Sequence, residues 1–271
     1  MKIGKKEFDM ENETYIAGIL NVTPDSFSDG GSYPTVDAAL LRVEQMIAEG
    51  ADLIDVGGES TRPGYTPVSD GEEIKRVTPV IEKIKARFDI PVSIDTYKGN
   101  VAEAALASGA DLVNDIWGLR HDDKIANVIK SHDVACCLMH NRENPVYGDF
   151  LSDVREDLTR SVSLAFRAGI AKERIILDPG VGFAKTYEQN LLVLKNLLYF
   201  REIGFPLLLG TSRKSVIGLA LDLPKQERVE GTLVTTMLAV QAGCAFVRVH
   251  DIKENKRAIR MLKTIETIGG V

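Results

Sequence analysis

Eight short runs of apolar and β-branched residues alternate with longer amphipathic stretches, and this alternation limits the possible folds more than any other feature. In 36–50, for example, Val36, Leu40 and Val43 recur at helical spacing. Repeated strand–helix units imply parallel strands joined by right-handed crossovers. The predicted strands are YIAGIL (15–20), DLIDV (52–56), VSI (92–94), DLVN (111–114), VACCLM (134–139), RIIL (174–177), PLLLG (206–210) and AFVRV (245–249).

Eight such units predict an α/β fold that closes as a (β/α)8 TIM barrel, and a chain of 271 residues has the usual length of this architecture. An open doubly wound sheet would show the same alternation and remains the alternative. The first fifteen residues do not fit a strand–helix unit, so we expect a short N-terminal hairpin that plugs the barrel. No linker interrupts the chain, and we expect residues 1–271 to form a single domain.

A weak internal repeat supports one repeated unit. The segments EGADLID, SGADLVND and AGCAFVRVHD each place a glycine directly before a predicted strand. Glycine after the last helical turn supplies the left-handed conformation that reverses the chain. We therefore expect positive φ at Gly50, Gly109 and Gly243.

The composition limits the partners and the cellular location that we expect for the protein. The chain has 33 basic and 39 acidic residues, a net charge of −6, which argues against nucleic acid as a partner. No apolar run approaches the ~20 residues that span a membrane, and no signal peptide is evident. Cys136, Cys137 and Cys244 show no metal-binding spacing and fit a hydrophobic core. We expect a cytoplasmic protein without membrane or nucleic-acid partners.

Polar residues stand at the predicted C-terminal ends of several strands: Asn21, Asp95, Asn114 and Asp178. A barrel builds its active site from these strand ends and the loops that follow them. Each residue could instead cap a turn with its own side chain. Because the strand ends meet at one rim, we favour a binding site, in which a carboxylate accepts paired hydrogen bonds from a guanidine-like edge.

Basic residues follow the last two predicted strands. Lys214 lies in TSRKS (211–215), while Arg248 and His250 alternate with apolar residues near the C-terminus. These two strands carry the usual phosphate site of the architecture, so they predict anion binding. A solvated basic turn and a core histidine are the alternatives.

Two long loops, NVTPDSFSDGG (21–31) and GGESTRPG (57–64), are rich in Gly, Ser, Thr and Pro. Loops of this kind often order over a ligand, although they could be plain surface loops. As parts of lids, Asn21 and Arg62 are candidates for contact with a phosphate or its metal ion.

Several motifs are absent. The segment DPGVGFAKT (178–186) follows a strand as a phosphate loop does, but it lacks the G-x-x-x-x-G-K-[ST] spacing. The chain also contains no G-x-G-x-x-G opening its first helix, no His-Glu-x-x-His and no G-x-S-x-G nucleophile elbow.

The remaining motifs occur together in one known family. GILNVTPDSFSDGG, GGESTRPG, SIDTYK, VNDI, MH, LDPGVGFAKT, GTSRKSVIG and RVHD span residues 18–251 and resemble the dihydropteroate synthase family of folate biosynthesis. The resemblance implies a (β/α)8 barrel and a transferase that condenses 7,8-dihydropterin-6-ylmethyl diphosphate with p-aminobenzoate. The implied products are 7,8-dihydropteroate and pyrophosphate.

The resemblance also implies roles for individual residues, Mg2+ as cofactor, sulfonamides as competitors of p-aminobenzoate, and a homodimer. Catalytic roles fall on Asp25, Arg62, Lys214, Arg248 and His250, where Asp25 helps to stabilise a cation. The implied pterin site is Asp95, Asn114, Met139, Asp178 and Lys214; the diphosphate site is Asn21 with Mg2+, Thr61, Arg62, Arg248 and His250; the p-aminobenzoate site is Phe27, Pro63, Phe183, Lys214 and Ser215.

This chemistry agrees with the residue types. The pterin edge presents adjacent N–H donors that a carboxylate can accept, and loss of pyrophosphate leaves a methylene cation conjugated to an electron-rich ring. We therefore expect an SN1-like path, in which binding energy is directed at developing charge.

Two other functions remain as alternatives, and the chain departs from the family pattern at one segment. A pterin-binding methyltransferase would share the carboxylate floor but would not need TSRKS or Arg-x-His. A barrel could also bind pterin without catalysis. After Met139 and His140 the chain reads NRENPVY, where the family usually has Gly before Pro; we expect a variant loop there.

Overall fold

The computed structural model describes residues 1–23, 36–59 and 67–268, and within them eight parallel strands form one sheet. Every predicted strand is present, and its observed ends lie within two residues of the predicted ends. The strands are β3 (Tyr15–Asn21), β4 (Leu53–Gly57), β5 (Val92–Asp95), β6 (Leu112–Asp115), β7 (Ala135–Met139), β8 (Ile175–Asp178), β9 (Leu208–Leu209) and β10 (Phe246–Val249).

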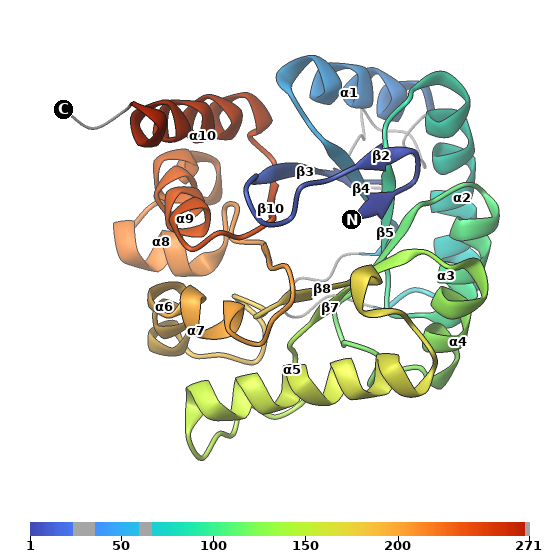
Figure 1. Cartoon of the computed structure of the whole chain (residues 1–271). Coiled ribbons are helices and arrows are strands. Elements are labelled where there is room, and N and C mark those ends of the chain that lie inside the picture. The colour runs from blue at the N-terminus through green and yellow to red at the C-terminus, as the bar shows by residue number, and fades with distance from the viewer. Residues whose placement is uncertain (24–35, 60–66, 269–271) are drawn as a thin grey trace.

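Helices surround the sheet as an outer layer (Figure 1). Several begin at the polar caps that stabilise free N–H groups; Thr186 and Gln189 form a reciprocal capping box. The helices are α1 (Val36–Glu49), α2 (Asp70–Arg87), α3 (Gly99–Ala107), α4 (Asp123–His132), α5 (Phe150–Arg167), α6 (Tyr187–Lys195), α7 (Leu197–Arg201), α8 (Ser215–Leu221), α9 (Val229–Gln241) and α10 (Ile252–Thr267), with 3-10 turns at Lys172–Arg174 and Lys225–Glu227.

The strand order closes the sheet into a barrel. The hydrogen-bonded order is β8-β7-β6-β5-β4-β3-β10-β9, so the first strand of the sheet lies between β4 and β10. A parallel bridge between Leu177 and Leu207 joins the two ends, and the Leu177 N–H donates to the carbonyl of Pro206 at 2.9 Å. The barrel prediction is confirmed, and the open-sheet alternative is wrong.

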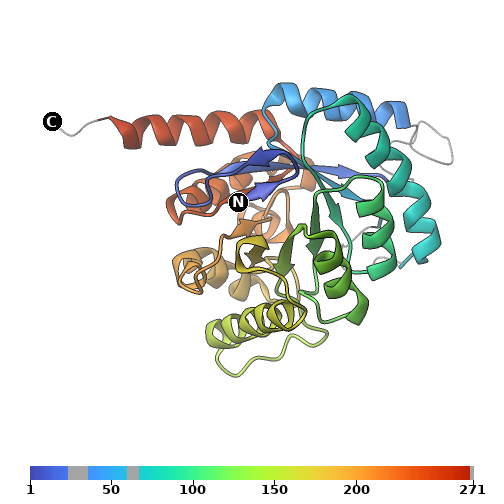
Figure 2. The same cartoon turned by 45° about the vertical axis from the view of Figure 1, so that its right-hand side comes forward.

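The N-terminal hairpin is confirmed as well. Strands β1 (Lys2–Ile3) and β2 (Lys6–Glu7) pair antiparallel. The side chains of Ile3 and Phe8 are buried against inward-facing barrel residues, and the rings of Phe8 and Phe246 lie 5.4 Å apart. The hairpin lies across one end of the barrel (Figures 1 and 2), and its apolar side chains fill that end. The other end is left to the polar strand ends.

The repeated glycines have the conformation that the sequence predicts. Gly50, Gly109 and Gly243 have φ values of 104°, 104° and 70°. Each lets a helix end and the chain enter the following strand without a Cβ penalty.

The cysteines are buried free thiols, as expected for core residues. In the part of the chain described, no helix is both long and apolar enough to span a membrane.

Candidate functional site

Four polar residues predicted for the site lie at one end of the barrel. The register pairs Asn21 with Gly57, Gly57 with Asp95, and Asp95 with Asn114. A Cβ on Gly57 would lie 3.6 Å from Asn21 Oδ1 and 3.8 Å from Asp95 Oδ2, so the glycine leaves open the space between them. Asp178 reaches the same level at the end of β8, where it pairs with Met139.

The Arg248 side chain extends from β10 into the barrel, where two carboxylates hold it. Its Nε donates to Asp55 Oδ2 at 2.5 Å, and its Nη2 donates to Asp95 Oδ2 at 2.5 Å. All three side chains are largely buried. The sequence analysis missed Asp55; an acidic residue inside an apolar strand (DLIDV) was the available signal.

Two carboxylate oxygens remain without a hydrogen-bond partner among the described residues: Asp55 Oδ1 and Asp95 Oδ1. An unpaired buried acceptor is costly, so these two oxygens are candidates to accept hydrogen bonds from a bound ligand. Burial raises the pKa of Asp95 to about 7, against the opposing effect of Arg248. Burial therefore outweighs the ion pair with Arg248 in its effect on the pKa of Asp95.

Asp178 combines both roles that its sequence position allowed. Its Oδ1 accepts the N–H of Gly180 at 2.7 Å, which caps the turn after β8. Its Oδ2 lies 3.8 Å from the position of a Cβ on Gly210, so it faces the barrel interior. Burial raises the pKa of Asp178, and Lys214 opposes that shift.

Lys214 spans the two sides of the predicted substrate site. Its Nζ donates to the carbonyl of Val181 and lies 4.7 Å from the centre of the Phe183 ring. Burial lowers the pKa of Lys214 to about 8, while Asp178 raises it. Its neighbour Arg213 instead forms a bidentate ion pair with Asp251, so of these two adjacent basic residues Lys214 is the one that faces the predicted substrate site.

An apolar wall stands beside the carboxylates. Met139 is buried in a cluster with Tyr97 and Ile116, and Trp117 and Phe183 pack against it. The sequence analysis named Met139 and Phe183 but missed the other three, whose aromatic or apolar character carries no functional signal by itself. The wall offers a flat ring system the contact that a pterin or an arylamine needs.

His250 lies one residue beyond β10, where Ser212 fixes its ring. The His250 N–H donates to Ser212 Oγ at 3.1 Å, and the same Oγ lies 3.0 Å from His250 Nδ1. With Nδ1 accepting from the hydroxyl, the ring proton stays on Nε2. Burial, followed by Arg248, lowers the pKa of His250 to about 3. His250 is thus a neutral hydrogen-bond donor, and Ser212 was missed.

The remaining predicted residues are placed as follows. Ser215 is the exposed first residue of α8. Asp25, Phe27, Thr61, Arg62 and Pro63 lie outside the described residues, and their roles stay predictions.

Glu59, two residues beyond β4, binds groups from two other segments of the chain. Glu59 accepts the Val68 N–H at 2.7 Å, the Tyr97 hydroxyl at 2.9 Å and the Lys98 ammonium at 2.7 Å. The buried carboxylate therefore links residue 59 to residue 68 and to Tyr97 and Lys98. Neither Glu59 nor Lys98 was expected from the sequence.

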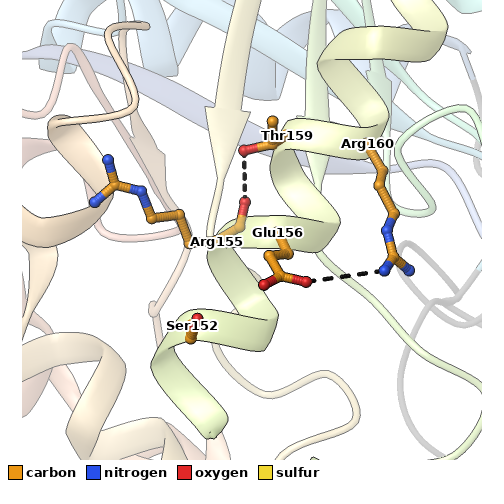
Figure 3. Close-up of a pocket in the computed structure, with 5 residues that line it drawn as sticks. All are labelled: Ser152, Arg155, Glu156, Thr159 and Arg160. Atoms are coloured by element: carbon orange, nitrogen blue, oxygen red, sulfur yellow. Dashed lines mark hydrogen bonds and ion pairs between the residues drawn. The ribbon is translucent and has the colours of Figure 1, made fainter.

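A surface depression of about 320 Å³ lies on α5. Figure 3 shows that its lining comes from α5 alone, and the carbonyl of Arg155 accepts from Thr159 there at 2.8 Å. Its side chains come from one helix face, and none of them belongs to the polar site. They are Ser152, Arg155, Glu156, Thr159 and Arg160.

Comparison with known proteins identifies the family. The profile described as "Pterin binding enzyme" matches residues 17–250. A dihydropteroate synthase of Clostridium beijerinckii is 57% identical over 98% of this chain and 99% of that protein. The chain belongs to the dihydropteroate synthase family. The resemblance noted in the sequence is confirmed, and the chain is an enzyme of this family.

Solved structures agree with the assignment. A dihydropteroate synthase from Clostridium difficile, determined in the presence of pteroic acid, superposes with a TM-score of 0.93 and 50% identity, covering 96% of this chain and 99% of that one. A Xanthomonas albilineans dihydropteroate synthase with 4-aminobenzoic acid gives a TM-score of 0.91 and 40% identity over 95% of both chains.

Proposed function

We propose that this enzyme condenses 7,8-dihydropterin-6-ylmethyl diphosphate with p-aminobenzoate, releasing pyrophosphate and forming 7,8-dihydropteroate. The observation that carries the substrate assignment is the buried Asp95 Oδ1, which has no hydrogen-bond partner among the described residues and lies at the same end of the barrel as Asn114 and Asp178. These acceptors suit the adjacent N–H donors of a pterin edge. The ligands of the two related structures, pteroic acid and 4-aminobenzoic acid, support the same pair of substrates.

The electrostatics support a dissociative path. Departure of pyrophosphate creates negative charge on the leaving group and positive charge on the methylene carbon. Arg248 supplies a permanent cation for the leaving group, and neutral His250 supplies an Nε2–H donor. Asp95 and Asp178 lie on the pterin side, where positive charge is delocalised. We assign no general base, because the arylamine nitrogen needs little activation.

Asn21 would hold Mg2+ together with the diphosphate. Mg2+ keeps several waters and often takes few protein ligands when substrate phosphates complete its coordination. One amide oxygen at the end of β3 fits that donor set, and Asn21 Oδ1 faces the open space over Gly57. When bound, the ion would neutralise charge on the departing pyrophosphate. Asn21→Ala should raise the Mg2+ concentration needed for half-maximal rate.

The activity test is formation of dihydropteroate from the two substrates, followed by mass spectrometry and by pyrophosphate release. Product should require p-aminobenzoate and Mg2+. A protein that binds the pterin diphosphate but forms no product with p-aminobenzoate would instead be a non-catalytic binder. Methyl transfer to a corrinoid with no condensation would support the methyltransferase alternative.

The path has its own test. Without p-aminobenzoate, an SN1-like ionisation lets the bound pyrophosphate rotate and return, which scrambles 18O from the bridging to the non-bridging positions. Scrambling at a rate comparable to turnover supports the dissociative path. Absence of scrambling, while turnover with p-aminobenzoate is normal, would favour direct displacement.

A homodimer is the expected assembly. Helices α6 to α9 are neighbours in the outer layer (Figure 1). Among the described residues, these helices expose large apolar side chains. Leu198, Leu219 and Val234 are 63%, 66% and 63% exposed. Exposed apolar surfaces of this kind are typical of subunit contacts. Light scattering should give twice the chain mass, and Leu219→Glu with Val234→Glu should give the mass of one chain.

The buried free thiols agree with a reducing compartment, which supports a cytoplasmic location.

A further inference from the structure

A buried chain of polar contacts lies behind the segment that follows β8, outside the groups assigned to the reaction. His140 is fully buried. Its Nε2 lies 3.2 Å from Asp157 Oδ2, and its Nδ1 lies 2.8 Å from Lys185 Nζ. The three residues therefore connect α5 to the far end of the DPGVGFAKT segment.

The direction of the hydrogen bonds follows from the chemistry of the groups. Burial lowers the pKa of His140 to about 4, so the ring is neutral. The Asp157 carboxylate can only accept, which places the ring proton on Nε2 and leaves Nδ1 to accept from Lys185. Lys185 Nζ also donates to the carbonyls of Gly180 at 2.9 Å and Phe183 at 3.1 Å. The Lys185 side chain thus ties two points of the turn together.

The turn that Lys185 ties has an unusual backbone. Gly180, Gly182 and Ala184 have φ values of 71°, 87° and 46°. Alternate left-handed residues, one of them with a Cβ, persist only where the surroundings determine them. The side chain of Phe183 projects from this turn to the Lys214 ammonium.

The segment after His140 supplies a second support. The Tyr147 hydroxyl donates to the Ala184 carbonyl at 2.8 Å. The Arg142 guanidinium lies 4.4 Å from the centre of the Tyr147 ring, and its Nε donates to Asp157 at 2.6 Å. Both supports therefore meet at Asp157, and the second one comes from the NRENPVY sequence in which this chain departs from the usual family pattern.

We propose that Asp157, His140, Lys185 and Tyr147 are positioning residues that hold Phe183 and its turn in place for p-aminobenzoate. They touch neither substrate and act through the backbone of 180–184. Lys214 is coupled to the same turn through its bond to Val181. The inference rests on the proposed function, because it assigns the turn to the second substrate.

The test compares Lys185→Met, which removes the ammonium at similar length, with the milder Tyr147→Phe, which removes only the hydroxyl. Lys83→Met, on the exposed face of α2, is the matched control. For Lys185→Met we expect the KM for p-aminobenzoate to rise by about tenfold or more while the Kd for the pterin diphosphate changes by less than about threefold. Tyr147→Phe should raise the same KM by about two- to fivefold.

Hydrogen exchange provides a readout that does not depend on catalysis. Amides in 181–185 should exchange faster in Lys185→Met than in wild type, with the remaining barrel unchanged. Equal exchange in both proteins, or an unchanged KM for p-aminobenzoate in both variants, would overturn the positioning role, even if the melting temperature fell. Should wild type form no product, the proposed function fails, while the exchange result still decides whether Lys185 holds the turn. If Lys185→Met does not fold, Tyr147→Phe carries the kinetic comparison.

Discussion

Arg248 Nε lies 2.5 Å from Asp55 Oδ2, although the two residues are 193 positions apart in the chain. Asp55 lies deeper in the barrel than Gly57 on the same strand, so it holds the guanidinium from below. Asp95 takes the other side of the guanidinium and keeps one oxygen unpaired among the described residues. Arg248 is thereby fixed between the pterin side and the diphosphate side of the proposed site.

Asp55→Asn should impair catalysis without abolishing folding. The amide keeps the shape but removes the charge that orients Arg248, so the leaving group loses part of its stabilisation. We expect kcat/KM for the pterin diphosphate to fall by about ten- to a hundredfold, which corresponds to about 1.4–2.7 kcal/mol. Steady-state pyrophosphate release measures it. Asp89→Asn, an exposed site, serves as control, and equal rates in both variants would contradict the role of Asp55.

Pterin affinity should depend on pH through Asp95. Its pKa is raised to about 7 by burial, so the carboxylate that accepts the pterin donors is ionised above that value and protonated below it. Affinity should therefore fall as pH decreases, by about tenfold between roughly pH 8 and pH 6. Fluorescence titration of the pterin measures it, with the pH dependence of the free pterin subtracted. Asp95→Asn should flatten the curve; a profile that is unchanged in this variant would exclude Asp95 as its source.

Ser212→Ala should affect the diphosphate and spare the pterin ring. Without the hydroxyl, the ring proton of His250 is no longer confined to Nε2, which weakens its bond to a phosphate oxygen. We expect the Kd for the pterin diphosphate to rise by about three- to tenfold, the value of one hydrogen bond. The Kd for a pterin that lacks the diphosphate should stay unchanged. Equal losses for both ligands would instead indicate a general distortion of the site.

Gly180→Ala should destabilise the fold. A Cβ at this residue would lie 2.0 Å from the His140 carbonyl oxygen, and φ is 71°. The turn must shift, at a cost of about 2–4 kcal/mol. Thermal melts test this against Gly71→Ala, where nothing lies within 4 Å of a new Cβ. A melting temperature for Gly180→Ala at or above that of the control would refute the steric argument.

The fold was predictable because its strands are buried on both faces and its helices are not. Periodicity changes at each junction, and the polar residues that matter stand where the strands end. Even β9, with two paired residues, was located from PLLLG. The closing bridge between Leu177 and Leu207 could not be seen, since nothing local specifies it.

The site was predictable only where function breaks a local pattern. Asp95 and Asp178 interrupt apolar runs at strand ends, and the family resemblance gave them roles. Asp55, Ser212 and Lys185 act through partners far away in the chain, so their importance appears only when the barrel brings those partners together. Lys185 belongs to DPGVGFAKT, which follows a strand as a phosphate loop does but lacks its spacing. Its contacts are with backbone carbonyls and His140.

The central claim is that the strand-end carboxylates bind the pterin, and calorimetric titration of Asp178→Asn tests it most directly. The amide can still cap the Gly180 turn but presents no charged acceptor to the ring. We predict a Kd for the pterin diphosphate that is weaker by about ten- to a hundredfold, with an unchanged circular dichroism spectrum. Binding within about twofold of wild type, in a protein that remains folded, would contradict the pterin assignment.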